Sequence, residues 1–343
     1  MAFRFVPGRT TRRAATGAVR ILRATAKANA AAARQTGALM RRGAEALRTA
    51  EPAHRPPGRF IEVDGVRVHV IARGKGRPVV LIHGNGTMAE DFVICGLVEQ
   101  LARTYRVIVI DRPGFGHTER PRHRVWTAAA QARLIGHALA ALNVERPVIV
   151  GHSWGTIVAL ALAANEGIDL RGLVLLSGYY YPGRRADVAL IAPLAVPGVG
   201  DAARAMMPGA VGQMLAPQVF RHVFKPQAVP ARFTARFPVA LSLSPTQGRA
   251  SAEDTASMNT AVALLQPHYA SLRLPVAILS GDADAVVDPR EQSCRLHEEV
   301  AGSTLTLLPG QGHMIHYAAK ARIVRAVEAQ MALTGRTLAW RSR

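Results

Sequence analysis

The sequence predicts an α/β fold, with a mostly parallel sheet, helices on both faces and an inserted helical cap. Short runs that are apolar at every position alternate with helix-forming segments, which is typical of parallel strands buried on both faces. One run leads through a Gly-x-Ser-x-Gly turn straight into a helix rich in Ala and Leu. The alternation stops at residue 179 and resumes at residue 273. We therefore expect two parts of one core, residues 59–178 and 273–343, with a helical cap over 179–272 between them.

The first part of the core begins with a hairpin and continues with buried strands. Residues 60–63 and 67–71 alternate between apolar and polar around Asp64-Gly65, a pair that favours a tight turn between two strands. The later strands are expected at residues 79–82, 106–111, 147–150 and 173–178. The helices between them are expected at residues 91–103, 127–142 and 157–164.

The second part of the core repeats the same rhythm after the cap. Strands are expected at residues 275–281 and 304–308, and helices at residues 289–301 and 314–332. Within the cap, Pro and Gly interrupt short helical pieces, and no strand pattern is visible. Its larger apolar residues line either a pocket over the site or the cap's own small core. They are Tyr179, Tyr180, Tyr181, Met206, Met207, Met214, Phe220 and Phe224.

The Gly-x-Ser-x-Gly turn is the feature around which the predicted site is built. A sharp strand-to-helix turn strains the central residue and packs the flanking residues closely, so Gly151 and Gly155 are needed on either side of Ser153. The serine hydroxyl then stands at the tip of the turn, beside the N-terminus of a helix. This arrangement is a nucleophile elbow.

The positive charge of the chain is concentrated at its N-terminus. The formal net charge is +20, and residues 1–59 contribute +11 of it through 13 basic and 2 acidic residues. We expect residues 1–58 to be an Ala/Arg-rich extension that ends in a Pro-rich linker. Basic residues recur every seven positions within residues 1–50 and form one face of a helix whose other face is weakly apolar, which favours a helix lying on an anionic membrane. A disordered basic tail is the alternative.

The composition also indicates where the protein is located and which partners it can have. No charge-free apolar run reaches 18 residues, so no membrane-spanning helix is expected. Cys95 and Cys294 lie far apart, which favours a reduced compartment and predicts no disulfide framework. The expected location is the cytoplasm, with contact at the inner face of the membrane, or the mitochondrion if the source is eukaryotic. Nucleic acid is not an expected partner, because the basic tail lacks interleaved aromatic residues beyond Phe3 and Phe5.

Serine is a weak nucleophile and needs a base, which in turn needs a carboxylate to orient it. Both should lie on loops that follow strands, at the same edge of the sheet as Ser153. The loop after residues 275–281 carries the acids Asp282, Asp284 and Asp288. The loop after the last strand carries His313 and His316. The residue spacing fits no metal site, and neither a metal nor a cofactor is expected.

Taken together, the elbow, the Gly-x-x-Asp before a Pro, and the Gly-x-Gly-His resemble those of the α/β-hydrolase superfamily over residues 60–335. The resemblance implies that Asp284 is the acid and His313 the base. It also implies an oxyanion hole formed by the backbone N–H groups of Asn85, after the early His-Gly, and of Trp154. Dehalogenases and epoxide hydrolases of this fold carry Asp at the tip of the elbow. Ser153 therefore argues against an alkyl-enzyme ester.

The function expected from these residues is hydrolysis of a carboxylic ester, small or lipophilic, through an acyl-enzyme intermediate. The same triad can hydrolyse a carbon–carbon bond or act as a cofactor-free perhydrolase or haloperoxidase. A more remote alternative is a non-catalytic binding module on this fold, which would require that the three side chains fail to converge.

Overall fold

The computed structural model describes residues 56–164, 167–183, 191–206 and 209–333 of the chain. The chain divides into two units, residues 1–55 and 56–343. The predicted membrane-surface helix over residues 1–50 therefore lies outside the described residues. All of the described residues belong to the second unit.

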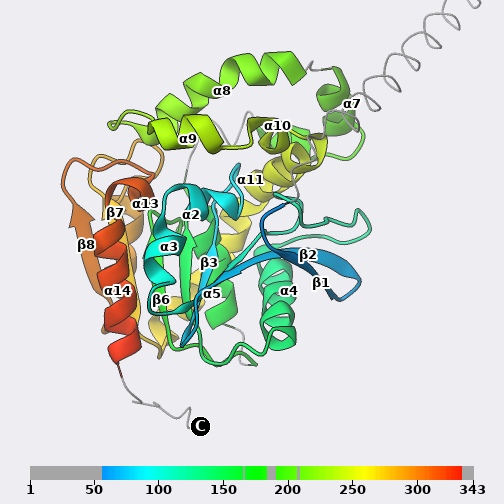
Figure 1. Cartoon of the computed structure of the whole chain (residues 1–343). Helices are drawn as coiled ribbons and strands as arrows, with labels where there is room; N and C mark the ends of the chain where they lie inside the picture. The colour runs from blue at the N-terminus through cyan, green and yellow to red at the C-terminus, as the bar shows by residue number, and fades with distance from the viewer. Residues whose placement is uncertain (1–55, 165–166, 184–190, 207–208, 334–343) are drawn as a thin grey trace, which may run out of the picture. The chain divides into compact units, whose positions relative to one another are not determined.

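An eight-stranded sheet forms the centre of this unit, in the order β1-β2-β4-β3-β5-β6-β7-β8 (Figure 1). The first hairpin and the β2–β4 pair are antiparallel, and all the other neighbours are parallel. The predicted mostly parallel sheet is thus confirmed. The strands are β1 (Arg59–Val63), β2 (Val66–Arg73), β3 (Pro78–Ile82), β4 (Arg106–Ile110), β5 (Val148–His152), β6 (Gly172–Leu176), β7 (Val276–Gly281) and β8 (Thr304–Leu308).

Helices cover both faces of the sheet, which explains why the central strands are apolar throughout. In β3, Val80 and Ile82 join the core cluster that contains α4 and α5, whereas Val79 and Leu81 join the cluster that contains α3 and α14. Successive side chains of a strand point to opposite faces, so a strand buried on both sides needs an apolar residue at every position. The helices of these two layers are α2 (Glu90–Ile94), α3 (Leu97–Leu101), α4 (Ala128–Ala141), α5 (Trp154–Ala163), α12 (Arg295–Glu299), α13 (Ile315–Ala318) and α14 (Lys320–Ala332).

Three predicted helices differ in detail from the structure. The segment predicted at 91–103 is two short helices, because Gly96 between them has a φ of 85° that ends the first one. The last predicted helix is likewise divided into α13 and α14 at Ala319, whose φ of −125° is not helical. The helix predicted at 289–301 begins as a π-helical turn over Arg290–Cys294 and continues as α12.

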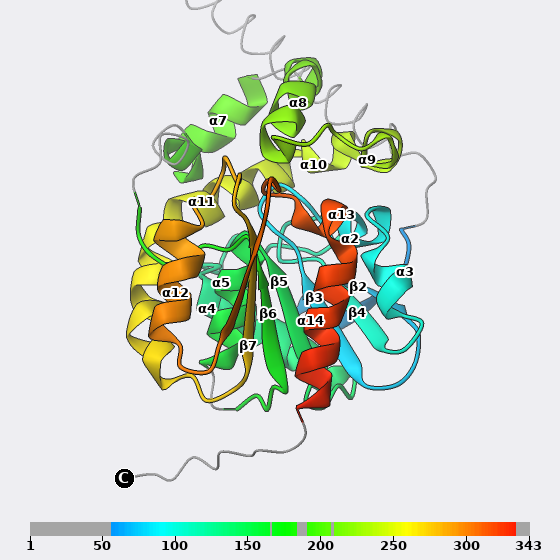
Figure 2. The same cartoon turned by 90° about the vertical axis from the view of Figure 1, so that its left-hand side faces the viewer.

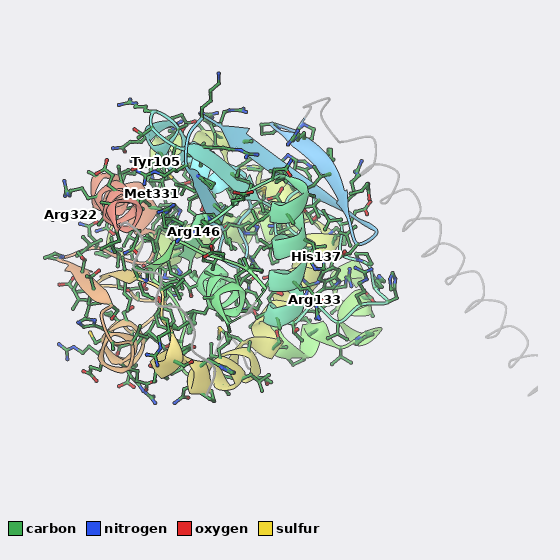
Figure 3. All side chains as sticks on the ribbon, turned by 90° about the horizontal axis from the view of Figure 1, so that it is seen from below. Tyr105, Arg133, His137, Arg146, Arg322 and Met331 are labelled. Carbon is green, nitrogen blue, oxygen red and sulfur yellow. The ribbon has the colours of Figure 1, made fainter. Side chains whose placement is uncertain are left out.

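The described part of the segment between β6 and β7 consists of helices joined by turns and irregular stretches. Figures 1 and 2 show α7 to α10 as a layer beyond the carboxyl ends of the parallel strands, with α11 running between that layer and the sheet. Figure 3 views the opposite end of the molecule, where Tyr105, Arg146 and Met331 lie. The helices of the segment are η1 (Ala192–Ala195), α7 (Val199–Met206), α8 (Gly209–Phe224), α9 (Ala231–Arg236), α10 (Val239–Ser242), α11 (Pro245–Leu265) and η2 (Gln266–Ser271).

An aromatic cluster joins this helical segment to the core. Phe233 stacks on Phe237 with ring centroids 4.5 Å apart, and Phe220 and Phe224 meet Phe233 edge-on. Tyr317 of α13 closes the cluster against Phe224. Such edge-to-face contacts add specific attraction to the burial of large apolar surfaces, so this side of the segment is firmly attached. Among the described residues, no helix is both long enough and apolar enough to cross a membrane.

Candidate active site

The turn between β5 and α5 holds Ser153 in a strained conformation. Its φ of 51° and ψ of −122° lie in a region that non-glycine residues rarely occupy. Neighbouring backbone leaves no room for a side chain beside it, since a Cβ on Gly155 would lie 2.3 Å from the Ile82 oxygen. The Ser153 N–H donates to the Leu176 oxygen at 2.9 Å, which fixes the tip of the turn to β6. The elbow predicted from the sequence therefore has the expected shape.

Ser153, His313 and Asp284 form one hydrogen-bonded chain. The distance from Ser153 Oγ to His313 Nε2 is 3.0 Å, and the distance from His313 Nδ1 to Asp284 Oδ2 is 2.8 Å. His313 is 5% exposed and Ser153 is 9% exposed, so the chain is largely shielded from water. With its Nδ1–H donated to the carboxylate, the imidazole presents a free electron pair on Nε2 to the serine hydroxyl.

Of the three acids in the loop after β7, Asp284 is the one that contacts His313. Its second oxygen accepts hydrogen bonds from the N–H groups of Val286 and Val287, so the whole carboxylate is oriented by the loop. Asp282 instead accepts from the N–H of Gly310, and Asp288 accepts from the N–H of Arg290. Asp282 therefore joins the loop after β7 to the loop after β8, whereas Asp288 caps a local turn.

His316, the alternative base, lies in a separate buried cluster. Its Nε2 is 2.9 Å from Asp91 Oδ2, and the Tyr317 hydroxyl donates to the other oxygen of the same carboxylate at 2.6 Å. The ring of His316 packs edge-on against His152, with centroids 4.4 Å apart. His316 thus lies behind the triad and takes no part in its hydrogen-bonded chain.

The loop after β3 comes close to Ser153 and carries the predicted oxyanion donor Asn85. A Cβ on Gly84 would lie 3.1 Å from the Ser153 Cβ, which shows how closely this loop passes the nucleophile. The Asn85 side chain turns away and donates to the Ser251 oxygen and to Thr255 Oγ1 of α11. The N–H of Trp154 is in the first turn of α5, where backbone N–H groups have no partner within the helix.

Two buried histidines brace these turns in their neutral form. Burial, reinforced by the adjacent Arg112 guanidinium, lowers the pKa of His83 to about 3. Its Nε2 accepts the Arg112 N–H, and its Nδ1–H donates to the Gly84 oxygen. Burial, followed by the neighbouring His316 and His313, also lowers the pKa of His152 well below its ordinary value. The Nε2–H of His152 donates to the His313 oxygen at 3.2 Å.

A buried ion pair that sequence reasoning missed ties α11 to the site. Arg112 lies two residues after β4, is completely buried, and donates to the main-chain oxygens of His83 and Gly84 in the loop after β3. Its guanidinium pairs with Asp254 of α11, which is also completely buried. The Asp254 main-chain oxygen in turn accepts from Trp154 Nε1 at 3.1 Å. In the sequence, Arg112 simply follows the strand predicted at residues 106–111, and no local pattern marks it as half of an ion pair.

The large apolar residues of the predicted cap, residues 179–272, do not form a single group in the structure. Tyr180 and Tyr181 are buried in the main core, where both N–H groups donate to Gln292 Oε1. Phe220 and Phe224 belong to the aromatic cluster, and Met214 is 66% exposed. The side chains of Met206 and Met207 lie outside the described residues.

The described residues contain no group of three or more His, Cys, Asp and Glu side chains placed to hold a metal ion. His313, His316 and the three acids of the β7 loop are divided among the separate hydrogen-bonded groups described above. The arrangement that the site offers is therefore a hydroxyl, an imidazole and a carboxylate in series.

Comparison with known proteins identifies the family. The family described as alpha/beta hydrolase fold matches residues 77–319. The chain is 25% identical over 280 residues to haloalkane dehalogenase 2 of Mycobacterium tuberculosis, covering 78% of this chain and 93% of that protein. It is 35% identical over 128 residues to 2-hydroxymuconate semialdehyde hydrolase of a Pseudomonas species, covering 36% of this chain and 45% of that protein.

The fold is likewise similar to that of a thermophilic esterase from Thermogutta terrifontis. The TM-score is 0.62 at 22% identity, and the match covers 80% of this chain and 98% of the esterase. Because the family match covers most of the chain, the assignment does not depend on any single relative. The chain belongs to the alpha/beta hydrolase family and is a hydrolase.

Proposed function

We propose that this hydrolase cleaves carboxylic esters through a Ser153–His313–Asp284 triad and an acyl-enzyme intermediate. The observation that carries the proposal is the hydrogen-bonded series Ser153 Oγ, His313 Nε2, His313 Nδ1 and Asp284 Oδ2, with distances of 3.0 and 2.8 Å. A nucleophile, a base and an orienting carboxylate in this order are what acyl transfer by serine requires.

In the first half of the reaction, His313 Nε2 takes the proton of the Ser153 hydroxyl while Oγ attacks the ester carbonyl. The negative charge on the carbonyl oxygen is stabilised by the N–H groups of Asn85 and Trp154, which we propose as the oxyanion hole. When the C–O bond breaks, the leaving alcohol takes the proton from His313. Asp284 holds the imidazole in the correct tautomer and stabilises its charged form.

In the second half, water attacks the acyl carbon and gives a proton to His313. The tetrahedral intermediate then collapses, the carboxylic acid leaves, and the proton returns to Ser153 Oγ. Each proton taken by the imidazole is thus given back, and no cofactor is required for this cycle. The low exposure of Ser153 and His313 keeps the oxyanion in surroundings where hydrogen bonds are strong.

The nucleophile decides between this chemistry and that of the dehalogenase relative. A dehalogenase of this fold forms an alkyl-enzyme ester on an Asp at the elbow, and water then attacks the carbonyl carbon of that carboxylate. Ser153 offers only a hydroxyl at this position. An ether formed by alkylation of serine would have no carbonyl for water to attack, so we propose acyl transfer and not dehalogenation.

A second candidate is hydrolysis of a carbon–carbon bond. The 35% identity to 2-hydroxymuconate semialdehyde hydrolase favours it, although the match spans only 45% of that protein. The likeness to the esterase, at 22% identity, shows the fold alone. The triad geometry serves both reactions, so a comparison of substrates is needed to decide between them.

We further propose that residues 179–272 act as a cap that shapes the substrate site. Support comes from the contacts that α11 makes with Asn85 and Trp154, on the two sides of the proposed oxyanion hole. A cap in this place would set which acyl and alcohol groups reach Ser153.

Residues 1–50 are proposed to bring the enzyme to an anionic membrane surface that holds its lipophilic substrate, on the basis of their charge pattern.

Substrate panels test the choice of reaction. The full-length enzyme should hydrolyse p-nitrophenyl esters, with kcat/KM rising as the acyl chain lengthens from acetate toward octanoate. The same preparation should cleave 2-hydroxymuconate semialdehyde far more slowly than the best ester. Efficient cleavage of the semialdehyde with no measurable ester hydrolysis would instead establish the carbon–carbon reaction. The Ser153→Ala variant serves as the control for non-enzymatic hydrolysis in both assays.

A further inference from the structure

Helix α8 is apolar on its outer face as well as on its inner face. Its inner side packs into the segment through Ala216 and Phe224, which are both buried. On the outer side, Met214, Leu215 and Val219 are 66%, 47% and 56% exposed. Successive residues of an α-helix turn by about 100°, so these three side chains span roughly 140° of the helix surface, which is one broad face. Such a face is a surface available for contact with another apolar partner.

The surroundings of this face are positively charged. Residues 202–252 contain no Asp or Glu, although the chain has 23 acidic residues in all. The same stretch holds the basic residues Arg204, Arg221, Lys225, Arg232, Arg236 and Arg249. Of these, Arg221, Lys225, Arg232 and Arg236 are exposed. An apolar face on a stretch of chain that carries cations and no acidic residue is complementary to a surface that is apolar inside and anionic outside.

The position of α8 connects this surface with the proposed site. Figures 1 and 2 show α8 as the outermost of the described helices on the side of the second unit where the parallel strands finish. That is the end at which β5 leads into Ser153. A partner bound to α8 would therefore lie on the side of the molecule from which substrate approaches.

We propose that the outer face of α8, centred on Met214, Leu215 and Val219, docks on the surface of an anionic lipid bilayer. A second copy of the chain is a poorer occupant, because a symmetric contact would bring two acid-free basic surfaces together. The interaction is peripheral: three apolar side chains enter the headgroup region while Arg221 and Lys225 meet lipid phosphates. This docking is independent of the proposed ester chemistry and of the proposed role of residues 1–50.

A fluorescent reporter on α8 tests the contact directly. In the full-length Leu215→Trp variant, vesicles of phosphatidylglycerol with dibrominated phosphatidylcholine should quench the introduced tryptophan and shift its emission to shorter wavelength. Leu333→Trp is the matched control, since Leu333 is 55% exposed but follows α14 near Met331, at the opposite end of the molecule (Figure 3). Quenching equal to that of the control, in a sample where the protein is bound to the vesicles, would overturn the proposal and leave residues 1–50 as the contact.

Affinity measurements complete the test. The double variant Leu215→Gln, Val219→Gln should bind phosphatidylglycerol vesicles about tenfold more weakly than the wild type, and Arg221→Glu, Lys225→Glu should weaken binding by at least about tenfold. Leu333→Gln should bind like the wild type. Circular dichroism should show that all of these variants keep the fold of the wild type. Unchanged vesicle affinity in both α8 variants would contradict the proposal, as would sedimentation showing that the outer face of α8 is covered by a second copy in solution.

Discussion

At the residue scale, Asp284 is distinguished by how many groups hold its carboxylate. One oxygen binds His313 Nδ1, and the other accepts two backbone N–H groups. An amide in its place could still accept one hydrogen bond but would carry no charge to stabilise the imidazolium. Asp288 lies four residues further along and caps a turn through the N–H of Arg290, without contact with His313.

The first prediction follows from this difference. Asp284→Asn should lower kcat for a p-nitrophenyl ester by about 10⁴-fold, because the imidazole then loses its tautomer and its charge partner. Asp288→Asn should stay within a few-fold of the wild type. Steady-state kinetics of the two variants, with circular dichroism to verify folding, give the comparison. A larger loss in Asp288→Asn would move the acid to the other residue.

The buried histidines His83 and His152 make the stability of the fold depend on pH. His83 has a pKa of about 3 in the folded protein, against about 6.5 for an unperturbed histidine. Between these values the unfolded chain binds a proton that the folded chain does not, so the stability of the fold decreases as the pH falls below about 6.5. His152 acts in the same direction, because its pKa is also lowered by burial.

The expected size of the effect can be measured by chemical unfolding. Between pH 7.5 and pH 5, His83 alone should reduce the free energy of unfolding by about 2 kcal/mol. A His83→Gln variant can still accept the Arg112 N–H but cannot titrate, so its stability should depend less steeply on pH. Equal pH dependence in the variant and the wild type would show that His83 is protonated in the fold or not buried.

At the element scale, α11 is bound to both sides of the proposed oxyanion hole. Asp254 pairs with Arg112, and it also accepts hydrogen bonds from Arg120 and Gln131. Arg112 in turn holds the backbone of the loop that contains Gly84. A buried guanidinium that loses its partner has a large desolvation cost, so the contact between α11 and the core depends on this one carboxylate.

A pair of isosteric variants measures that dependence. Asp254→Asn should lower the free energy of unfolding by about 3–5 kcal/mol, because it leaves Arg112 charged and buried without a counter-ion. The neighbouring Glu253 also pairs with Arg120, but its side chain is 28% exposed, so Glu253→Gln should cost only about 0–1 kcal/mol. Denaturant titrations of both variants decide the point, and similar losses would mean that the buried pair has no special role.

The same elements show which parts of the structure the sequence could predict. The β5 strand, the elbow and α5 follow from residues adjacent in the chain, and so do the loops that carry Asp284 and His313. The pairing of Arg112 with Asp254 joins residues 142 positions apart, and no local pattern specifies it. Gly96 was visible inside a predicted helix, but only the tertiary structure shows that it adopts a positive φ and ends α2 there.

At the scale of the whole molecule, the chain combines a hydrolase unit with a strongly basic extension. The triad residues and the proposed oxyanion donors all lie beyond residue 80, so the chemistry should not need residues 1–50. The extension is proposed to act by charge, and each basic residue near an anionic surface contributes about 1 kcal/mol at low salt. Salt screens this attraction over a distance of about 10 Å at 0.1 M.

Removal of residues 1–50 tests this division of roles. Turnover of a water-soluble ester should change by less than about twofold, because no residue assigned to the triad or the oxyanion hole is lost. Co-sedimentation with phosphatidylglycerol vesicles at low salt should weaken, and added salt should weaken it further in the full-length protein. If the full-length and shortened proteins bind the vesicles equally at every salt concentration, the extension has no membrane role.

The central claim is that Ser153 is the nucleophile and carries the acyl group. The most direct measurement is mass spectrometry of the protein after reaction with a fluorophosphonate, which traps an activated serine hydroxyl. We predict one added phosphonyl group, located on the peptide that contains Ser153, with complete loss of ester hydrolysis and no labelling of Ser153→Ala. Labelling of Ser153→Ala to the same extent as the wild type, or ester hydrolysis that survives modification of Ser153, would contradict the account.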